Sequence, residues 1–380
     1  GSLAPRVFGD AREGAQLPAV RPTDPLARTG RALLKEMLQP ATLEDFEACF
    51  QRQCLLVRRP AAPGFWGEYY GRADVEAMLA GGDARFGEAF TLSRVEGGVR
   101  RDYNSNLDGS TGPAKAADVW QRFEGGCSMR ILHPQRWSRR LGHLVVALEE
   151  HFECLVGINA YFTPKGKAQG FAPHYDDIDA FVLQVEGRKR WTLYPTPAPE
   201  HALPLLSSSD FRADALGPPA AEVELGPGDL LYMPRGAIHA AQTLGAEDSL
   251  HLTVSTNQMH TWANLLELAL PEALRVASDR FLALRETPSI GYFNHLGAMH
   301  CDKLGKRRAA LLQRAQDLAE LVLGCVAEGG DEGEATPVDA AADYMNARFQ
   351  EGRMPPVRGR QSKKSEGPKR KRRRGEEAEG

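Results

Sequence analysis

The stretch GFAPHYDDIDAFVLQVEGRKRW, residues 170–191, places a histidine and several acidic residues directly before an apolar run. His174 and Asp176 are two positions apart, so on an extended chain their side chains point to the same face. The apolar run that follows is typical of a buried strand, and Glu186-Gly187 is typical of the turn that ends it. The stretch therefore predicts two potential metal ligands at the end of a hydrophobic strand.

A third potential ligand lies further along the chain. The segment GPGDLLYMPRGAIH ends in His239, and strands that are distant in sequence can be neighbours in a β-barrel. Two histidines and one carboxylate form the facial triad of non-haem Fe(II) oxygenases, which leaves other metal positions open. Each of these residues alone would more often be an ordinary surface residue, and the combination is what indicates a metal site. Asp177 and Asp179 are interpreted as residues that shape the entrance and make it acidic, which would favour a basic substrate.

A triad does not select a reaction, whereas the pocket beside it does. In a 2-oxoglutarate enzyme a buried cation must meet the distal carboxylate, because an unpaired buried charge is costly. Lys189 follows the Glu186-Gly187 turn, on a strand expected to run back alongside the one that leaves Asp176. Asn159 and Ser255 lie on other expected strands and are candidates for hydrogen bonds there.

The chain around this stretch alternates short β-type runs with turn residues from residue 154 to residue 256, which favours an antiparallel sandwich or barrel. Before it we expect mixed elements. These are a helix from Thr42 with a capping-box pattern, a strand from Cys54, a helix from Asp74, a loop over 100–115, a strand over 127–132 and a helix over 134–152. The fold class expected is mainly β with flanking helices.

The texture becomes helical after Thr256. Residues 261–284, 306–329 and 337–350 are amphipathic stretches whose apolar faces suit either core packing or a partner chain. Residues 351–380 hold 11 basic and 5 acidic residues, although the whole chain has a formal net charge of −3. This last segment is almost free of large apolar residues and is expected to be disordered. Its run KRKRRR, Lys369–Arg374, is typical of a nuclear-import signal or of nonspecific RNA contact.

Composition limits the other possibilities. The hydrophobic fraction of 42% suits a buried core, and no apolar run is long enough for a transmembrane helix. No signal-peptide pattern is visible, and the six cysteines form no CxxC pair, which favours a reducing compartment.

The quoted segments, together with GINAYFTP and SLHLTVST, resemble the JmjC-domain ribosomal oxygenases, in particular the histidyl-hydroxylase and lysine-demethylase type. The resemblance spans roughly residues 30–350. It implies a double-stranded β-helix, a cupin-like jelly roll, followed by a helical dimerisation region. Members of the family continue into a winged-helix domain, and we expect this sequence to lack most or all of that domain.

The resemblance also implies roles for individual residues and for cofactors. The iron ligands would be His174, Asp176 and His239. The 2-oxoglutarate contacts would be Lys189, Asn159 and Ser255. Arg130 and Tyr161 would line the substrate side. Fe(II), 2-oxoglutarate and dioxygen are the implied cofactors and cosubstrates, with ascorbate in support.

The expected organisation is an irregular segment over 1–30, a JmjC domain over 31–256, a helical dimerisation region over 257–350 and a basic tail over 351–380. The function implied is hydroxylation of a side chain, expected to be histidine, of a large-subunit ribosomal protein in the nucleus or nucleolus. Two alternatives stay open: demethylation of histone methyl-lysine by the same chemistry, and a non-catalytic metal-binding scaffold in ribosome assembly or chromatin. We expect a homodimer without membrane association.

Overall fold

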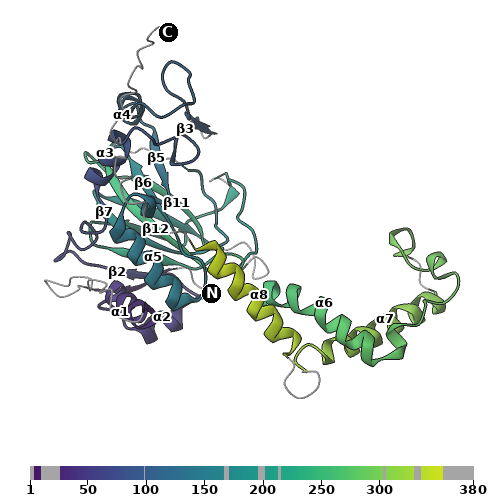
Figure 1. The fold of residues 1–380 in the computed structure, drawn as a ribbon. Helices are drawn as coiled ribbons and strands as arrows, with labels where there is room; N and C mark the ends of the chain where they lie inside the picture. Colours follow the sequence, from purple (N-terminus) through teal and green to yellow (C-terminus); the bar gives the residue numbers. More distant parts are fainter. Residues whose placement is uncertain are drawn as a thin grey trace, which may run out of the picture.

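The computed structural model describes residues 4–9, 26–97, 99–166, 171–195, 202–212, 215–302, 305–328 and 335–353. Figure 1 shows two parts, a wedge of strands flanked by helices and a helical arm that projects from it. Residues 354–380 of the expected disordered tail lie outside the described residues, whereas residues 351–353 are ordered at the end of a helix, so the expectation of disorder was wrong there.

A large, mostly antiparallel sheet forms the wedge. Its strand order in the described residues is β1-β2-β10-β7-β12-β6-β5-β3-β4, with only β1 and β2 paired in parallel. The bounds are β1 (Arg6–Phe8), β2 (Leu55–Val57), β3 (Phe90–Glu96), β4 (Val99–Asp102), β5 (Ser128–Leu132), β6 (Gly157–Thr163), β7 (Asp179–Glu186), β10 (Leu230–Met233) and β12 (Ser249–Thr256).

A smaller sheet, in the order β11-β8-β9, faces the large one. It contains β8 (Lys189–Tyr194), β9 (Ala221–Leu225) and β11 (Ile238–Thr243). The chain passes from the large sheet to the small one between β7 and β8, at Gly187. There φ is 62°, and a Cβ would lie 2.0 Å from the carbonyl oxygen of Asp248. The two sheets form the jelly-roll core that the fold-class prediction describes, and that prediction is confirmed.

β7 lies inside the large sheet and is buried on both faces, which explains why residues 180–183 of this strand are all apolar. Phe181, Leu183 and Val185 pack into the cluster beneath the helices. Ala180 and Val182 pack into the cluster between the two sheets. This division follows the period-two alternation of a strand.

Helices cover the outer face of the large sheet (Figure 1). They are α1 (Leu26–Leu38), α2 (Leu43–Cys49), α3 (Arg72–Ala80), α4 (Ala116–Glu124) and α5 (Arg139–Phe152). The capping box predicted at Thr42 is confirmed, because the Thr42 side chain accepts from the Asp45 N–H and the Asp45 carboxylate accepts from the Thr42 N–H.

Three expectations about these elements were wrong in detail. Residues 1–30 are not wholly irregular, since they hold β1 and the start of α1. Residues 99–102 form the edge strand β4, so the expected loop begins later. The expected helix over 134–152 is interrupted, because Ser138 caps α5 and separates it from a short 3₁₀ turn.

The arm consists of α6 (Trp262–Arg280), α7 (Lys306–Gly324) and α8 (Pro337–Gly352), and the described residues between α6 and α7 form three short 3₁₀ turns. Arg353, just past α8, fastens the arm to the wedge. Its guanidinium lies 3.0 Å from the carboxylate of Glu149 and 2.6 Å from that of Glu150, both on α5.

All six cysteines are free thiols, five of them buried. Among the described helices none combines the length and apolar character that a membrane crossing requires.

Candidate metal centre and its cavity

The H-x-D pair and His239 meet where the two sheets adjoin. His174 and Asp176 lie in the segment before β7, and His239 is the second residue of β11. The N–H of His174 donates to the carbonyl of His239 at 3.1 Å, and the reverse hydrogen bond is 2.9 Å. The segment of residues 171–178 is otherwise irregular, so the expected extended strand around the pair is reduced to this single bridge.

Both imidazoles direct the same nitrogen inward. Nδ1 of His174 lies 2.8 Å from the carbonyl of Ala172, and Nδ1 of His239 lies 2.9 Å from that of Ala237. A carbonyl accepts only from N–H, so the proton belongs on Nδ1 and the lone pair on Nε2. Each Nε2 lies 3.9 Å from a carboxylate oxygen of Asp176.

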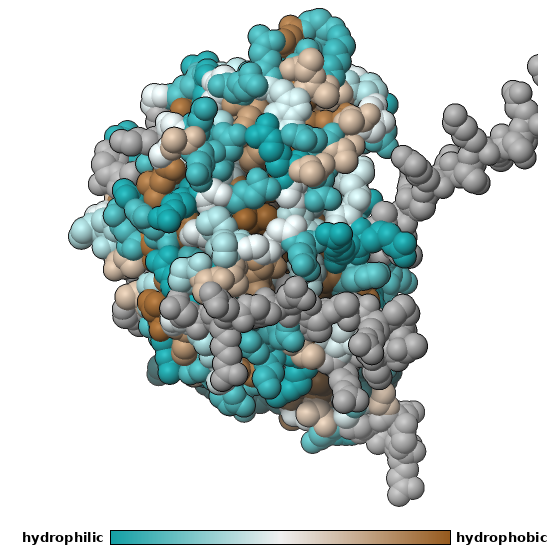
Figure 2. Space-filling view, turned by 90° about the vertical axis from the view of Figure 1, so that its left-hand side faces the viewer, coloured by the Kyte–Doolittle hydropathy of each residue, from teal (hydrophilic) through white to brown (hydrophobic). Residues whose placement is uncertain are grey.

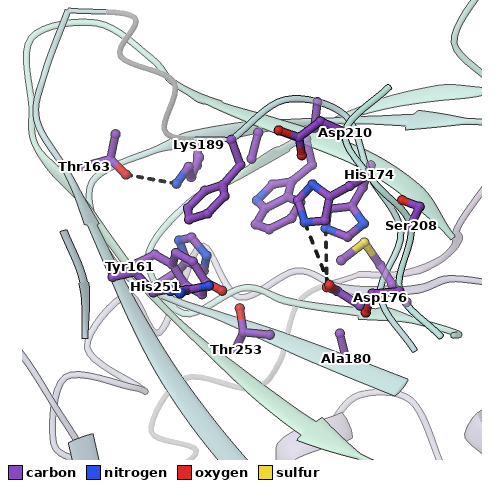
Figure 3. A pocket seen from close by; sticks show the side chains of 18 of the residues that line it. Tyr161, Thr163, His174, Asp176, Ala180, Lys189, Ser208, Asp210, His251 and Thr253 are labelled. Atoms are coloured by element: carbon purple, nitrogen blue, oxygen red, sulfur yellow. Dashed lines mark hydrogen bonds and ion pairs between the residues drawn. The ribbon is translucent and has the colours of Figure 1, made fainter. Parts of the chain in front are cut away.

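The three side chains therefore surround one point. One potential ligand atom from each of them lies within 4.8 Å of the other two (Figure 3). Burial, together with the nearby His174, lowers the pKa of His239. A neutral imidazole is the form that binds a metal ion. Two imidazoles and one carboxylate on one side of a cavity fit a divalent iron-type ion and leave its other positions open.

A cavity of about 220 Å³ adjoins this point. Its walls combine aromatic and polar side chains from both sheets, as Figure 3 shows for Tyr161, Thr163, Lys189, His251 and Thr253. It lies between the sheets, is partly open to solvent, and has room for a small ligand next to the potential metal ligands.

Among the described residues that line this cavity, Lys189 is the only lysine, and it is 5% exposed. Its ammonium group donates a hydrogen bond of 3.1 Å to Oγ1 of Thr163. No carboxylate of the described residues forms an ion pair with it, and desolvation lowers its pKa to about 7. A buried cation without a counter-ion is the arrangement that an anionic ligand would complete.

Arg130 and Tyr161 form the wall on the β5–β6 side. They face each other across neighbouring strands, and both line the cavity. The Tyr161 ring stacks on His251 of β12, with centroids 4.9 Å apart and planes 5° from parallel. The expectation that Arg130 and Tyr161 lie beside the site is thus consistent with their positions, although their contact with substrate stays a prediction.

Asn159 and Ser255 lie one step further along the same strands. Asn159 is opposite Thr253 on β12, and Ser255 is opposite Ala180 on β7. Thr253 and Ala180 line the cavity, whereas Asn159 and Ser255 are not among its lining residues. Their proposed contact with a cosubstrate therefore stays a prediction.

The expectation of an acidic entrance was wrong for Asp179, which is fully buried. The Asp177 carboxylate accepts a hydrogen bond of 2.6 Å from Ser207, a residue that lines the cavity, so its role at the entrance stays a prediction. The cavity walls themselves carry three cationic side chains and two carboxylates, namely Arg100, Arg130, Lys189, Asp176 and Asp210. The charge of the cavity therefore gives no support to a preference for basic substrates.

Sequence reasoning missed several lining residues, and strand alternation could have identified two of them. Thr163 follows Tyr161 by two positions, and His251 precedes Thr253 by two, so each shares a face with its neighbour. Phe171 and Arg100 carry no such signal. They come from an irregular segment and an edge strand, with the Arg100 guanidinium 4.6 Å from the centre of the Phe171 ring.

Comparison with known proteins adds a family and several relatives. Residues 130–265 match the family model described as JmjC domain. The chain is 38% identical to ribosomal oxygenase 1 of Gallus gallus over 331 residues, which cover 87% of this chain and 52% of the relative. It is 37% identical over 329 residues to the bifunctional lysine-specific demethylase and histidyl-hydroxylase NO66 of Drosophila grimshawi, covering 86% of this chain and 43% of the relative.

The chain thus spans about half the length of the curated relatives it matches. Among solved structures, ycfD of E. coli is similar, with 17% sequence identity and a TM-score of 0.49 over 80% of this chain and 71% of the other.

Proposed function

Because this chain carries a JmjC domain and is similar to ribosomal oxygenases along most of its length, we propose that it is an Fe(II)- and 2-oxoglutarate-dependent protein hydroxylase. One observation supports this most strongly. Three potential metal ligands and an unpaired buried lysine line the same cavity. A simple metal-binding scaffold would need the three ligands but would have no use for the lysine.

His174, Asp176 and His239 would hold the metal ion through two Nε2 atoms and a carboxylate oxygen. With its cosubstrate bound, Fe(II) supplies the oxidation of an unactivated C–H bond by dioxygen, with succinate and carbon dioxide released. The chain's own contribution is to fix three ligands on one side and to keep the remaining positions open toward the cavity.

Lys189 would bind the distal carboxylate of 2-oxoglutarate, supported by Thr163. Because its ammonium group is buried, its attraction to an anion would be stronger than in water. The resulting ion pair would also orient a ligand that reaches the metal ion. Asn159 and Ser255 would contact the same ligand, and Arg130 with Tyr161 would contact the substrate. The two facing sheets would limit the access of bulk water to this site.

For the substrate we propose a side chain, histidine first, of a large-subunit ribosomal protein. The names of the relatives, ribosomal oxygenase and histidyl-hydroxylase, support this choice. The name of the second relative also includes lysine-specific demethylase, so methyl-lysine of a histone is the second candidate. Both reactions begin with hydroxylation of a carbon atom, and the same cavity would serve either.

The exposed hydrophobic residues of the arm favour a second copy of the chain as a partner. Trp262, Leu266, Leu270 and Leu274 recur every four residues on α6 and are 80, 39, 36 and 48% exposed. Such a stripe on a helix is usually covered by another helix. In contrast, Figure 2 shows a face of the wedge on which hydrophobic side chains are scattered among hydrophilic ones. We propose that region 257–350 forms a homodimer.

The proposed location is the nucleus, in particular the nucleolus. The names of the relatives are consistent with work on ribosomal proteins or histones. The basic run Lys369–Arg374 lies outside the described residues, and its sequence is the only support for import and for RNA contact.

The test is turnover of peptides by the purified chain with Fe(II), 2-oxoglutarate and ascorbate. The panel comprises histidine-containing peptides of large-subunit ribosomal proteins, the same peptides with alanine for histidine, and methylated histone peptides. We expect succinate release and a mass gain of one oxygen atom on a histidine peptide, both absent in His174→Ala. Loss of a methylene mass from a histone peptide would favour demethylation instead. Metal and 2-oxoglutarate binding without turnover of any peptide would contradict the proposed activity and favour a scaffold.

A further inference from the structure

Asp179, the first residue of β7, carries a carboxylate in the interior of the protein. It is 0% exposed, and no cation of the described residues forms an ion pair with it. Four neutral donors surround it instead. Oδ1 accepts from the Tyr232 hydroxyl at 2.9 Å and from the Arg235 N–H at 3.2 Å. Oδ2 accepts from the side-chain amides of Gln51 at 3.2 Å and Asn257 at 3.0 Å.

These donors come from four separate segments of the chain. Gln51 follows α2, Tyr232 is on β10, Arg235 is in the turn between β10 and β11, and Asn257 follows β12. A buried carboxylate is costly unless all its acceptor positions are used, so its surroundings are strongly restrained. Asp179 thereby fixes the ends of several strands relative to one another.

The same carboxylate completes the pairing of the two segments that carry the potential metal ligands. His174 and His239 exchange two backbone hydrogen bonds, and the Gly236 N–H donates to the Asp176 carbonyl at 3.0 Å. The next contact along the two segments is the one between the Asp179 side chain and the Arg235 N–H. The two segments are therefore joined by a series of hydrogen bonds. In the last of these, the Asp179 carboxylate takes the place of a backbone carbonyl as the acceptor.

We propose that Asp179 is a positioning residue for the metal centre. By holding the turn at Arg235 against the start of β7, it sets the separation of Asp176 and His239. This inference rests on the proposed metal-binding function. Asp179 is not among the residues that line the cavity, and none of its four hydrogen-bond donors is a potential metal ligand, so it would act through the backbone.

Asp229 offers a matched control in the same sheet. It is 4% exposed and precedes β10 at the end opposite to Tyr232. Its carboxylate also accepts several hydrogen bonds, from the Arg59 N–H at 2.8 Å, the Arg58 guanidinium at 2.9 Å and the Gly226 N–H at 3.0 Å. None of these donors belongs to a segment that carries a potential metal ligand.

The test compares Asp179→Asn with Asp229→Asn. Asparagine keeps the size of the side chain but turns an NH₂ group toward donors that need an acceptor. The two readouts are the Mn(II) dissociation constant at low temperature and the Tm of the metal-free protein. We expect both variants to lower Tm, since each leaves buried donors unpaired. Only Asp179→Asn should weaken Mn(II) binding, by about tenfold or more, as loss of an outer partner of a metal site typically does.

Equal Mn(II) affinity in Asp179→Asn and wild type would overturn the proposal, as would an equal loss of affinity in Asp229→Asn. If Asp179→Asn does not fold, Tyr232→Phe removes one donor with little change in shape. It should still weaken Mn(II) binding by a few fold, and an unchanged affinity would again overturn the proposal. Failure of the wild type itself to bind Mn(II) would refute the proposed function instead.

Discussion

The wedge buries its large hydrophobic side chains, whereas the arm leaves a row of them exposed. In β7 of the wedge, Phe181 and Leu183 are 0% exposed. In α6 of the arm, the fully buried positions are Ala269, Ala273 and Ala277, while the leucines one turn earlier on the neighbouring stripe face outward. The wedge buries its own core and contains a complete set of potential ligands, whereas the arm lacks a cover. We infer that ligand binding belongs to the wedge alone and that assembly belongs to the arm.

His239→Ala should have the largest effect, and it tests whether metal binding can be lost without a change in assembly. Removing one of three metal ligands should weaken Mn(II) binding at least about a hundredfold, more than loss of an outer partner usually does. Turnover should fall below detection, and the oligomeric state should not change. Calorimetric Mn(II) titration and light scattering measure the two quantities. His143→Ala, at an exposed position of α5, is the matched control and should bind Mn(II) as the wild type does.

Lys189→Met should have the next largest effect. It should lower the affinity for 2-oxoglutarate and raise the Tm of the ligand-free protein. Loss of the ammonium group should weaken 2-oxoglutarate binding about a hundredfold, since truncation of a buried charged partner typically costs that much. The same change removes an unpaired buried charge, so the Tm without ligand should rise. Lys115→Met, at an exposed lysine paired with Asp108, should change neither. A lower Tm without ligand would show that Lys189 supports the fold rather than a ligand.

The pH dependence of 2-oxoglutarate binding follows from the lowered pKa of Lys189, about 7 in the free protein. A bound carboxylate favours the charged ammonium group and raises this pKa, so binding takes up a proton above pH 7. Affinity should be constant somewhat below pH 7 and fall by up to about tenfold per pH unit above it. Titrations in buffers of different ionisation enthalpy would measure the proton uptake. Proton release on binding would contradict this assignment.

A variant of the arm should have the smallest effect on ligand binding. Leu266→Asp with Leu270→Asp places two charges on the exposed stripe of α6, which should turn a dimer into a monomer in light scattering. The Mn(II) dissociation constant should stay within about twofold, because no residue of α6 lines the cavity and sites without shared contacts usually behave independently. Glu267→Gln on the same helix is the control for the oligomeric state. A monomeric variant that also binds Mn(II) more weakly would contradict the inference that metal binding is independent of dimerisation.

The sequence allowed the site to be predicted better than its surroundings. His174, Asp176, Lys189 and His239 were identifiable because motif spacing and turn residues placed them at strand ends. Thr163 and His251 follow from alternation on strands already predicted. The buried position of Asp179 could not be foreseen, because an acidic residue beside a ligand pair is usually solvated, and its four donors come from segments far apart in the sequence.

The edges of elements were the weakest part of the fold prediction. Residues 99–102 lack the apolar alternation of a strand because β4 lies at the edge of the sheet, with polar side chains exposed. Ser138 separates a 3₁₀ turn from α5 where the apolar periodicity alone runs on. The amphipathic pattern of α6 was visible in the sequence. Only the structure shows that its alanines pack against the rest of the arm while its leucines are exposed.

The most direct test of the central claim is the binding of 2-oxoglutarate with and without Mn(II), measured by calorimetry on the wild type and on His239→Ala. If the metal ion and 2-oxoglutarate share one cavity, Mn(II) should tighten 2-oxoglutarate binding by about tenfold or more, as coupled sites commonly do. This gain should vanish in His239→Ala. Equal affinity of the wild type for 2-oxoglutarate in the presence and absence of Mn(II) would contradict the account.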